Sequence, residues 1–561
     1  MKSIYKKPLY EVKKITDLKD MLEQSAKTFN EKTAFLMKCD GQYMPITYSQ
    51  FKRDVDALGT ALIDLGLKDK RIAVIGENRY EWAVAYMAVV CGTGVVVPLD
   101  KELPEDEVRP LIEIADLEAI IYSPKNAKIV ESVKINHKIN METDLKELIK
   151  KGNELIEKGN REFLDAKIDA EKMSILLFTS GTTSSAKAVM LSHSNICINL
   201  MAMCSMINVD INDTMLSILP LHHTYECTCG FLAAIYRGCT VAYCEGLRYI
   251  AKNIKEAKAT LILCVPLLAE NIYRKIWNQA KKTNRADKLA KGIKISNFLR
   301  KFGIDKRRKI FSDIHKEFGG KLTRLVSGAA GIDPEIAKGL SDLGIDVVQG
   351  YGLTECAPIG ALNRFIYFKF ESAGLPLPGV EIKIDNPDED GIGEILIKGG
   401  NVMLGYYNNE EATKAVIKDG WFYTGDLGYM DKDSFVYITG RKKNVIVTKN
   451  GKNIFPEELE TRLCRSPYIA ECMVYGQDSE DGDTLVIAQV IPQMDEIEAV
   501  LGKTPSVEKI QELLDEEALK VNHQLQLYKR INKVIIRHEE FAKTTTQKIK
   551  RHVEMERGEV K

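Results

Sequence analysis

The sequence predicts an α/β protein with a large N-terminal domain of layered α/β sheets, a β-rich subdomain and a small α+β C-terminal domain. Apolar strands alternate with helical stretches through much of residues 45–350, which is typical of α/β layers. From about Gly374 the chain changes to short strands and glycine turns, as in residues 391–398. A polar segment at residues 439–443 then separates two strand-like runs. This segment is the expected domain boundary.

The length of 561 residues exceeds what one hydrophobic core supports, so several domains or subdomains are expected. We place the N-terminal domain at residues 1–441 and the C-terminal domain at residues 442–561. In the second domain, Pro456 suits the first turn of a helix. One face of a further helix is marked by apolar residues at Ile510, Leu513, Leu514, Ala518 and Val521.

Charge and cysteine content exclude several classes of protein. The 79 Lys and Arg residues balance 79 Asp and Glu residues, so no overall field favours nucleic acid or an anionic membrane. Cys227 and Cys229 lie near His222 and His223, but no second cysteine pair follows at the spacing of a zinc site. Buried thiols in a reducing compartment are the simpler interpretation.

One uncharged run, residues 82–99, is long enough to raise the question of a transmembrane helix. Its two glycines and a proline argue against that, and so do its neighbours. Residues 71–75 are typical of a strand, residues 81–91 of a helix and residues 94–97 of a second strand. The run is therefore interpreted as a buried βαβ unit. Because residues 1–7 lack the apolar core of a signal peptide, we expect a cytoplasmic protein without a transmembrane segment.

Further buried strands are expected at residues 175–178, 261–265 and 345–348. Between about Glu270 and Lys321 lies a helical segment rich in Lys and Arg. The simplest interpretation of this segment is a solvated helical face, and peripheral contact with a lipid surface is the alternative.

Residues 178–187 carry the strongest functional signal. Ser and Thr dominate this segment, which follows an apolar strand, ends at Lys187 and precedes an expected helix entry near residues 191–195. Hydroxyls and backbone N–H groups can donate to phosphate oxygens, and the lysine neutralises charge. The segment lacks the glycine spacing of a Walker loop, and Ala188 stands where that motif needs Ser or Thr, which excludes a P-loop kinase or GTPase. A flexible surface turn is the alternative for this segment alone.

Polar residues also follow the strand that ends near Gln349. The carboxyl ends of strands in α/β sheets are where ligands bind. Tyr351 offers a flat face for a purine, Thr354 a hydroxyl for phosphate, and Glu355 a hard oxygen ligand for Mg²⁺. A half-buried strand end and a helix cap are the structural alternatives for Tyr351 and Glu355.

Three more polar features complete the pattern. Asp426 ends the segment 421–426 and can accept hydrogen bonds from both ribose hydroxyls. Arg441 follows fifteen residues later, and Lys548 ends a second polar loop that begins at Lys543. Each has a structural alternative, a salt bridge for Asp426 and a solvated surface run for Lys548. All of these features in one chain and in this order are far less expected than any one alone.

On these residues the chain is identified as similar to the adenylate-forming superfamily, which includes acyl-CoA synthetases, luciferases and the adenylation domains of peptide synthetases. The resemblance spans about residues 20–555. The family motifs TSGTTGxPKGV, YGxTE, TGD and GRxK correspond to Thr179–Val189, Tyr351–Glu355, Thr424–Asp426 and Gly440–Lys443. Within the family, the chain most resembles long-chain fatty-acid–CoA ligases at Leu219–His223, at Ser327–Gly331 and in the helical insertion after Pro266.

The resemblance implies an ATP-dependent acid–thiol ligase. Such an enzyme activates a fatty carboxylate, here of medium to long chain, as acyl-AMP and transfers the acyl group to CoA. ATP, Mg²⁺ and CoA are the implied cofactors. By the same resemblance the β- and γ-phosphates would be held by Thr179, Ser180, Gly181, Thr182, Thr183 and Lys187. Glu355 would hold Mg²⁺, and the remaining nucleotide-binding positions would include Ala329, Tyr351, Asp426 and Arg441.

The implied catalytic residues are Lys548, Thr354, Glu355 and His223. Lys548 would bridge the acyl carboxylate and the α-phosphate, stabilising charge as it develops. His223 would lie beside the carboxylate, although the adjacent His222 is an equal candidate. The family's second half-reaction implies a mobile C-terminal domain that turns about Lys443 and brings Gly451 to a pantetheine tunnel.

Four positions depart from the family pattern: Ser184, Ala186, Ala188 and Gln547 replace glycine, proline, glycine and glycine. Serine or alanine in place of glycine stiffens a loop that must open and close. A non-catalytic nucleotide-binding protein is therefore one alternative function. A ligase that loads an acyl carrier protein, or that stops at fatty acyl-AMP, is another. We expect a carboxylate substrate, no nucleic-acid partner, and a monomer or homodimer.

Overall fold

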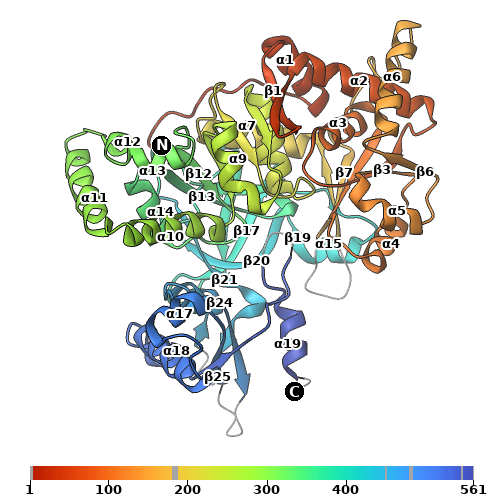
Figure 1. The fold of residues 1–561 in the computed structure, drawn as a ribbon. Coiled ribbons are helices and arrows are strands. Elements are labelled where there is room, and N and C mark those ends of the chain that lie inside the picture. Colours follow the sequence, from red (N-terminus) through yellow and green to blue (C-terminus); the bar gives the residue numbers. More distant parts are fainter. Residues whose placement is uncertain (1–3, 180–186, 449–451, 479–483, 545–547, 560–561) are drawn as a thin grey trace. The chain divides into compact units, whose positions relative to one another are not determined.

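The computed structural model describes residues 4–179, 187–448, 452–478, 484–544 and 548–559 (Figure 1). The chain forms two compact units. Unit 1 consists of Met1–Ile382, Ile397–Phe422 and Lys432–Phe435, and unit 2 of Lys383–Leu396, Tyr423–Asp431 and Val436–Lys561. The predicted boundary between residues 441 and 442 marks where a mobile C-terminal domain is expected to begin, and it stays a prediction.

The larger sheet of unit 1 has nine strands in the order β15-β14-β13-β12-β11-β9-β10-β1-β2. Its central strands are parallel, and apolar residues fill them because both faces are covered. Antiparallel pairs extend it at both edges. The strands are β1 Thr33–Cys39, β2 Gln42–Thr47, β9 Thr214–Ser217, β10 Thr240–Tyr243, β11 Leu261–Cys264, β12 Arg324–Ser327, β13 Asp346–Gly352, β14 Ile359–Leu362 and β15 Leu375–Pro376.

A second sheet of unit 1 has seven strands in the order β18-β8-β7-β4-β3-β5-β6. Strands β3 and β4 precede and follow helix α3 (Tyr80–Ala88) in sequence and pair in parallel, so the predicted βαβ unit is confirmed and the apolar run is a buried core segment. The strands are β3 Lys70–Ile75, β4 Gly94–Leu99, β5 Ala119–Tyr122, β6 His137–Asn140, β7 Met173–Thr179, β8 Lys187–Ser192 and β18 Gly405–Tyr406.

Helices surround these sheets, and their amphipathic patterns explain their placement. For example, α2 buries Phe51, Val55 and Leu58 and packs against α3 and α6. The helices are α1 Leu18–Phe29, α2 Tyr48–Asp64, α3 Tyr80–Ala88, α4 Glu105–Ile114, α5 Ala127–Ser132, α6 Asp144–Glu157, α7 His193–Met206, α8 Ala233–Arg237, α9 Ile250–Ala257, α14 Pro334–Asp342 and α15 Glu410–Val416. A π-helical segment, η3, runs from Tyr225 to Leu232 before α8.

The predicted basic helical segment is present as four helices between β11 and β12. Leu289 of this segment and the aromatic ring of Phe311 are buried in the same apolar core as β11 and β12. The helices are α10 Pro266–Lys282, α11 Ala286–Lys301, α12 Arg307–Ile310 and α13 Ser312–Glu317. In the part of the chain that the structure describes, no helix has the length and apolar character needed to cross a bilayer.

A five-stranded sheet contains the predicted β-rich region, and three of its strands contribute residues to both units. Its strands are β16 Val380–Asp385, β17 Gly393–Gly399, β19 Ile417–Lys418, β20 Trp421–Met430 and β21 Val436–Arg441. The short-strand texture expected from Gly374 onward is thereby confirmed.

The C-terminal part of unit 2 is the expected α+β arrangement. A three-stranded sheet packs with α16 and α18 around one apolar core that includes Leu459, Val474 and Leu514. Pro456 begins α16 and Ser506 caps α18, as the sequence pattern of both helices requires. The elements are β22 Ile446–Val447, β23 Asn453–Ile454, β24 Ile469–Asp478, β25 Thr484–Pro492, β26 Lys533–Ile536, α16 Pro456–Leu463, α17 Met494–Leu501, α18 Val507–Asn522 and α19 Arg551–Glu559.

Candidate active site

The base of the Ser/Thr-rich loop is a β-hairpin. Thr179 at the end of β7 pairs with Lys187 at the start of β8, and the Thr179 hydroxyl donates to the Lys187 carbonyl at 3.4 Å. The two strands therefore hold both ends of the loop in register. Four residues expected to contact phosphate lie outside the described residues, namely Ser180, Gly181, Thr182 and Thr183.

The expected helix entry near residues 191–195 is confirmed, and a strand lies between Lys187 and that entry. Lys187–Ser192 forms strand β8, whose Val189 and Leu191 are buried against β7. Helix α7 begins only at His193, where Ser192 and Asn195 form a capping box. Six residues of extended chain span about 20 Å, so the N-terminal N–H groups of α7 lie far from Lys187 along the chain. The loop, the strand end and the lysine are thus the elements available for phosphate.

Lys187 and Glu355 are joined by a third residue, Tyr406. The Lys187 Nζ lies 4.7 Å from the centroid of the Tyr406 ring, and the Tyr406 hydroxyl donates to Glu355 Oε1 at 2.9 Å. Strand β18 places Tyr406 there, because Tyr406 pairs with Val189 of β8. Burial raises the pKa of Tyr406 and the Glu355 charge raises it further, so the hydroxyl stays a donor.

Tyr406 belongs to none of the sequence motifs. It lies fifty-one positions after Glu355, outside every motif, and only the antiparallel pairing of β18 with β8 brings it to the site. No local pattern in a two-residue strand carries that information.

The turn that carries Thr354 and Glu355 is held from two sides. The Glu355 carbonyl accepts from the Met403 N–H at 2.8 Å. The side-chain amides of Asn199 and Asn401 each donate to the carbonyls of Cys356 and Ile359, at 2.7–3.2 Å. Since these groups are buried, the turn is fixed in place. Glu355 thus sits on a rigid support, half-buried, as a metal-binding carboxylate requires.

Tyr351 lies at the end of β13, half-buried, with glycine on both sides. A Cβ atom at Gly352 would lie 1.8 Å from the Pro358 carbonyl oxygen, so only glycine fits this position. A Cβ atom at Gly350 would lie 3.0 Å from Leu362. The close approach of the chain explains the glycines that flank Tyr351.

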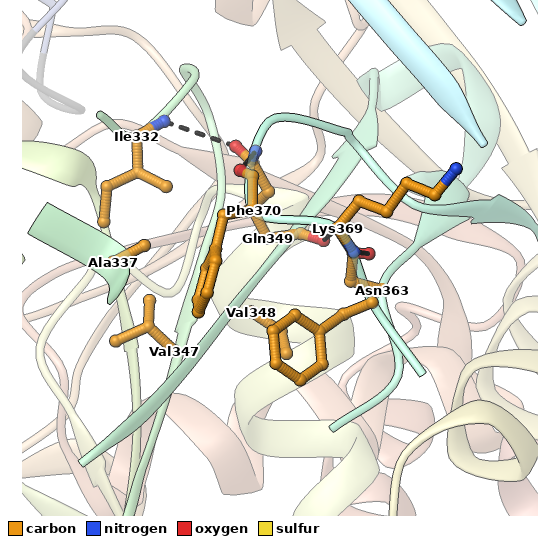
Figure 2. Close-up of a pocket in the computed structure, with 9 residues that line it drawn as sticks. Ile332, Ala337, Val347, Val348, Gln349, Asn363, Lys369 and Phe370 are labelled. Atoms are coloured by element: carbon orange, nitrogen blue, oxygen red, sulfur yellow. Dashed lines mark hydrogen bonds between the residues drawn. The ribbon is translucent and has the colours of Figure 1, made fainter. Parts of the chain in front are cut away.

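Gln349 connects two loops beside Tyr351. Its Oε1 accepts from the Ile332 N–H at 3.3 Å, and its Nε2 donates to the Phe370 carbonyl at 3.0 Å (Figure 2). The surrounding side chains, among them Val347 and Ala337, pack closely and leave no room for a ligand in this pocket. Gln349 therefore holds the loop after β12, which contains Ala329.

Ala329 has a φ of +70°, a conformation that L-residues rarely adopt. The neighbouring Gly328 is required by packing, because a Cβ atom there would lie 2.8 Å from the Tyr225 ring. The Tyr225 hydroxyl donates to the Val326 carbonyl at 2.7 Å. Tyr225 thus joins the loop around residues 222–226 to the segment around residues 326–330.

The adjacent histidines have different surroundings. His222 lines a cavity of about 10 Å³ together with apolar side chains that include Leu177 and Ile196. Burial lowers the pKa of His222, and Asp100, whose Oδ2 lies 3.6 Å from Nε2, opposes the change. His223 is half-exposed, and its Nδ1 accepts from the Tyr225 N–H at 3.3 Å. Either ring remains a candidate for the position beside the carboxylate.

A buried carboxyl group, Glu226, lies behind this loop. Burial raises its pKa to about 8, while hydrogen bonding from Ser217 and the Leu219 backbone opposes the rise. Among the described residues, Glu226 Oε2 has no hydrogen-bond partner. The glycine at position 230 makes room for this group, because a Cβ atom there would lie 2.8 Å from Glu226 Oε1.

In unit 2, Asp426 and Arg441 face each other across paired strands β20 and β21. Arg441 Nε lies 2.7 Å from Asp426 Oδ1, and the Asp426 side chain is buried while that of Arg441 is 40% exposed. Thr424 orients the turn by accepting from the Asp426 N–H at 3.1 Å and donating to the Ile395 carbonyl at 2.7 Å. The pair offers a carboxylate and a planar cation at one point of the sheet.

The second lysine loop also belongs to unit 2. Its ends are paired: the Thr544 N–H donates to the Lys548 carbonyl at 2.8 Å, and the Lys548 N–H donates to the Thr544 hydroxyl at 3.1 Å. Partial loss of hydration beside the surrounding protein atoms lowers the pKa of Lys548, and the charge of Arg441 lowers it further. The charge of Asp426 opposes the change, and the Lys548 side chain is exposed. Lys548 is thus within electrostatic range of the Asp426–Arg441 pair.

Two further predicted residues concern the expected hinge. Lys443 is exposed, in a single 3-10 turn after β21, and its neighbour Lys442 pairs with Glu394 at 2.9 Å. Gly451 lies outside the described residues. A role for either residue in domain rotation stays a prediction.

The residues present suit Mg²⁺ at Glu355. This ion is commonly held by one or two carboxylates together with substrate phosphates and water. Glu355 is oriented by the Tyr406 hydroxyl, which is the outer contact that metal-binding carboxylates usually have. Among the described residues, no group of three or more His, Cys, Asp or Glu side chains forms a complete protein cage for a metal. A metal here would therefore depend on the nucleotide for its other ligands.

Two family descriptions match the chain. Residues 22–407 match the AMP-binding enzyme family, and residues 443–557 match the AMP-binding enzyme C-terminal domain. The chain belongs to the AMP-binding enzyme family. The adenylate-forming identity expected from the motifs is confirmed, and the two matches leave residues 408–442 between them.

Relatives in this family carry related names. The chain is 27% identical over 468 residues to the long-chain-fatty-acid–CoA ligase FadD15 of Mycobacterium bovis, covering 78% of this chain and 76% of that one. It is 28% identical over 500 residues to the human long-chain-fatty-acid–CoA ligase 1, covering 82% and 71%.

Solved structures of the family confirm the fold. The anthranilate CoA ligase AuaEII in complex with anthranoyl-AMP superposes with a TM-score of 0.77 at 18% identity, covering 99% of this chain and 98% of that one. ATP-bound MatB from Rhodopseudomonas palustris superposes with a TM-score of 0.74 at 23% identity, covering 97% and 98%. The predicted α/β class with a large N-terminal and a smaller C-terminal part is thereby confirmed.

Proposed function

We propose that this AMP-binding enzyme is an acid–thiol ligase that joins a medium- to long-chain fatty acid to CoA through an acyl-AMP intermediate. The observation that carries the proposal is the Lys187–Tyr406–Glu355 arrangement, which holds a cation and a carboxylate on one aromatic side chain beside the Ser/Thr-rich loop. The names of the relatives support the fatty-acid substrate and CoA as acceptor.

In unit 1, Lys187 would neutralise the β- and γ-phosphates together with Thr179 and the loop residues. Glu355 would hold Mg²⁺, and Thr354 would donate to a phosphate oxygen. Tyr351 would lie against the adenine ring. When bound, Mg²⁺ would neutralise charge on the phosphates. The hydrogen bond from the Tyr406 hydroxyl orients the Glu355 carboxylate.

In unit 2, Asp426 would accept from the ribose hydroxyls, and Arg441 would keep that carboxylate oriented. Lys548 would approach the α-phosphate and the acyl carboxylate, where negative charge develops as the carboxylate oxygen attacks the α-phosphorus and pyrophosphate leaves. No general base is needed for this step, because a fatty carboxylate is already ionised at neutral pH. In the second step the thiol of CoA attacks the acyl carbon and AMP leaves. A turn about Lys443 that exchanges Lys548 for the segment near Gly451 is part of the proposal.

The test is a screen of carboxylates by ATP-dependent pyrophosphate release, from acetate to palmitate and including aryl acids. We expect the highest kcat/KM for acids of medium to long chain. Activity confined to an aryl acid, such as anthranilate, would overturn the fatty-acid assignment and leave the ligase assignment intact. If ATP binds but none of the acids causes pyrophosphate release, a non-catalytic nucleotide-binding protein would be favoured.

The acceptor is tested separately by supplying either free CoA or a holo-acyl carrier protein. We expect thioester formation with CoA. Thioester on the carrier protein alone would favour the acyl carrier protein ligase, and accumulation of acyl-AMP with both acceptors would favour a fatty acyl-AMP ligase.

A cytoplasmic location also belongs to the proposal. The twelve cysteines all lie among the described residues and none is in a disulfide, and nine of them are buried. Free thiols persist in reducing compartments, which supports this location.

A further inference from the structure

Helix α11 turns an apolar stripe toward solvent. Ile295, Phe298 and Phe302 are 58%, 59% and 67% exposed, and their spacing of three and four positions puts them on one side of the helix. The rings of Phe298 and Phe302 contact each other edge to face, with centroids 5.2 Å apart. An exposed apolar stripe of this kind is costly unless something covers it.

The exposure does not come from a loosely placed helix. The opposite side of α11 is anchored: Leu289 is buried in the core beside β11 and β12, Ile293 packs against the same core, and Ser296 is fully buried. Beyond the helix, Ile304 and Ile310 are also exposed apolar side chains, at 43% and 38%. We name these five side chains, Ile295, Phe298, Phe302, Ile304 and Ile310, the apolar stripe.

Positive charge surrounds the stripe. Residues 266–320 contain fifteen Lys and Arg side chains but only five Asp and Glu, a net charge of +10 in a chain whose overall net charge is zero. Lys288 and Lys291 precede the stripe at the same helical spacing, and Lys294 and Lys301 flank it. All four are exposed, and no described residue forms an ion pair with any of them.

We propose that α11 and the loop after it form a docking surface for an anionic phospholipid bilayer. The apolar stripe would enter the boundary between headgroups and acyl chains, and the flanking lysines would contact lipid phosphates while their methylene stems cover apolar surface. Figure 1 shows α11 along an outer edge of unit 1, with α10 and α12 beside it.

A bilayer fits the surface better than nucleic acid does. Three of the five apolar side chains are isoleucines, which cannot stack on bases, whereas single-stranded nucleic acid is bound by aromatic stacking. A bilayer buries aliphatic and aromatic side chains alike, and its anionic headgroups also attract the basic side chains of the surface. The inference stands apart from the proposed reaction, although a fatty acid dissolved in the same bilayer would lie close to an enzyme docked there.

The experiment is co-sedimentation of the full chain with vesicles of phosphatidylcholine alone or with about one quarter phosphatidylglycerol, at about 0.1 M salt. We expect partitioning onto the anionic vesicles to exceed that onto the neutral ones by at least about tenfold. The F298S/F302S double variant is expected to lose at least about tenfold of this partitioning. The K288Q/K291Q/K294Q variant is expected to lose the preference for anionic lipid.

The matched control is V500S/L527S, which removes two apolar side chains that are 59% and 78% exposed and lie in unit 2. It should partition like the unchanged protein. Thermal unfolding midpoints within a few degrees of the parent show that each variant is folded. Absence of vesicle binding by the unchanged protein would overturn the inference, and so would unaltered binding by F298S/F302S. Binding to a mixed-sequence single-stranded oligonucleotide in place of vesicles would reassign the surface to nucleic acid.

Discussion

The Tyr406 hydroxyl donates a hydrogen bond to Glu355 Oε1 at 2.9 Å, while the ring of the same tyrosine lies under the Lys187 ammonium group. One side chain therefore orients the carboxylate and the cation that the proposed reaction needs at the phosphates. The aromatic ring and the hydroxyl act on different partners, so their contributions can be separated by substitution.

Tyr406→Phe keeps the ring beneath Lys187 and removes the donor to Glu355. Loss of an outer contact to a metal-binding carboxylate lowers metal affinity by about tenfold or more. We expect the Mg²⁺ concentration for half-maximal pyrophosphate release to rise by about tenfold, with little change in the unfolding midpoint. The neighbouring Tyr407→Phe is the matched control, and an equal Mg²⁺ response in both variants would contradict the role of Tyr406.

Asp426→Asn keeps the shape of the side chain and removes its charge. A hydrogen bond to a charged group contributes about 1.5–3 kcal/mol, so the KM for ATP should rise by about tenfold or more. Arg441→Ala should lower the free energy of unfolding by only about 1 kcal/mol, because the arginine is 40% exposed and water screens the pair. Lys442→Ala, which removes the adjacent cation, serves as control for both measurements. An unchanged KM for ATP in Asp426→Asn would sink the ribose assignment.

Lys548→Ala separates the two half-reactions. Removing a group that stabilises developing charge costs about 100-fold or more in rate, so ATP–pyrophosphate exchange should fall by that amount. Transfer of a supplied acyl-AMP to CoA should persist, since the lysine acts only in the first step. The matched control is Lys550→Ala, two positions further on. Retained exchange in Lys548→Ala would refute the proposed role.

Glu226→Gln tests the buried carboxyl group behind the histidine loop. The pKa of Glu226 is raised from 4.5 to about 8, so the folded protein holds one more proton than the unfolded chain between those values. Stability of the parent therefore falls as pH rises through this window, and Glu226→Gln removes that loss. The stability of the variant relative to the parent should increase with pH, by up to about 1.4 kcal/mol per unit between pH 5 and 8.

Urea unfolding at several pH values measures this difference directly. The exposed helical residue Glu113 supplies the control, Glu113→Gln, whose difference from the parent should not change with pH in this manner. A difference between Glu226→Gln and the parent that is constant from pH 5 to 8 would show that the carboxyl group is ionised throughout.

Much of the fold could be predicted because local pattern and tertiary environment agree. The βαβ unit at residues 70–99 combines β-branched strands with a helix of matching length, and the parallel pairing of β3 with β4 follows. The pairing of Arg441 with Asp426 could also be predicted, because the two residues lie on adjacent strands of one hairpin.

The parts that could not be predicted depend on contacts between distant segments. Strand β8 at Lys187–Ser192 is one such part, because its pairing partner β7 lies on the other side of the Ser/Thr-rich segment in sequence. Tyr406 and Gln349 act through a short edge strand and through loop carbonyls, for which a single sequence holds no periodic signal. Burial of Glu226 in a π-helical segment likewise follows from packing against the ends of the strands.

Asn199 and Asn401 donate to the same two carbonyls, those of Cys356 and Ile359, from separate parts of the chain. The two amides are therefore redundant. If one asparagine is replaced by another residue, the other still donates a hydrogen bond to each carbonyl oxygen. A substitution at one asparagine should then be tolerated as long as the other is present. Substituting both should disrupt the turn, so the two substitutions should be strongly non-additive.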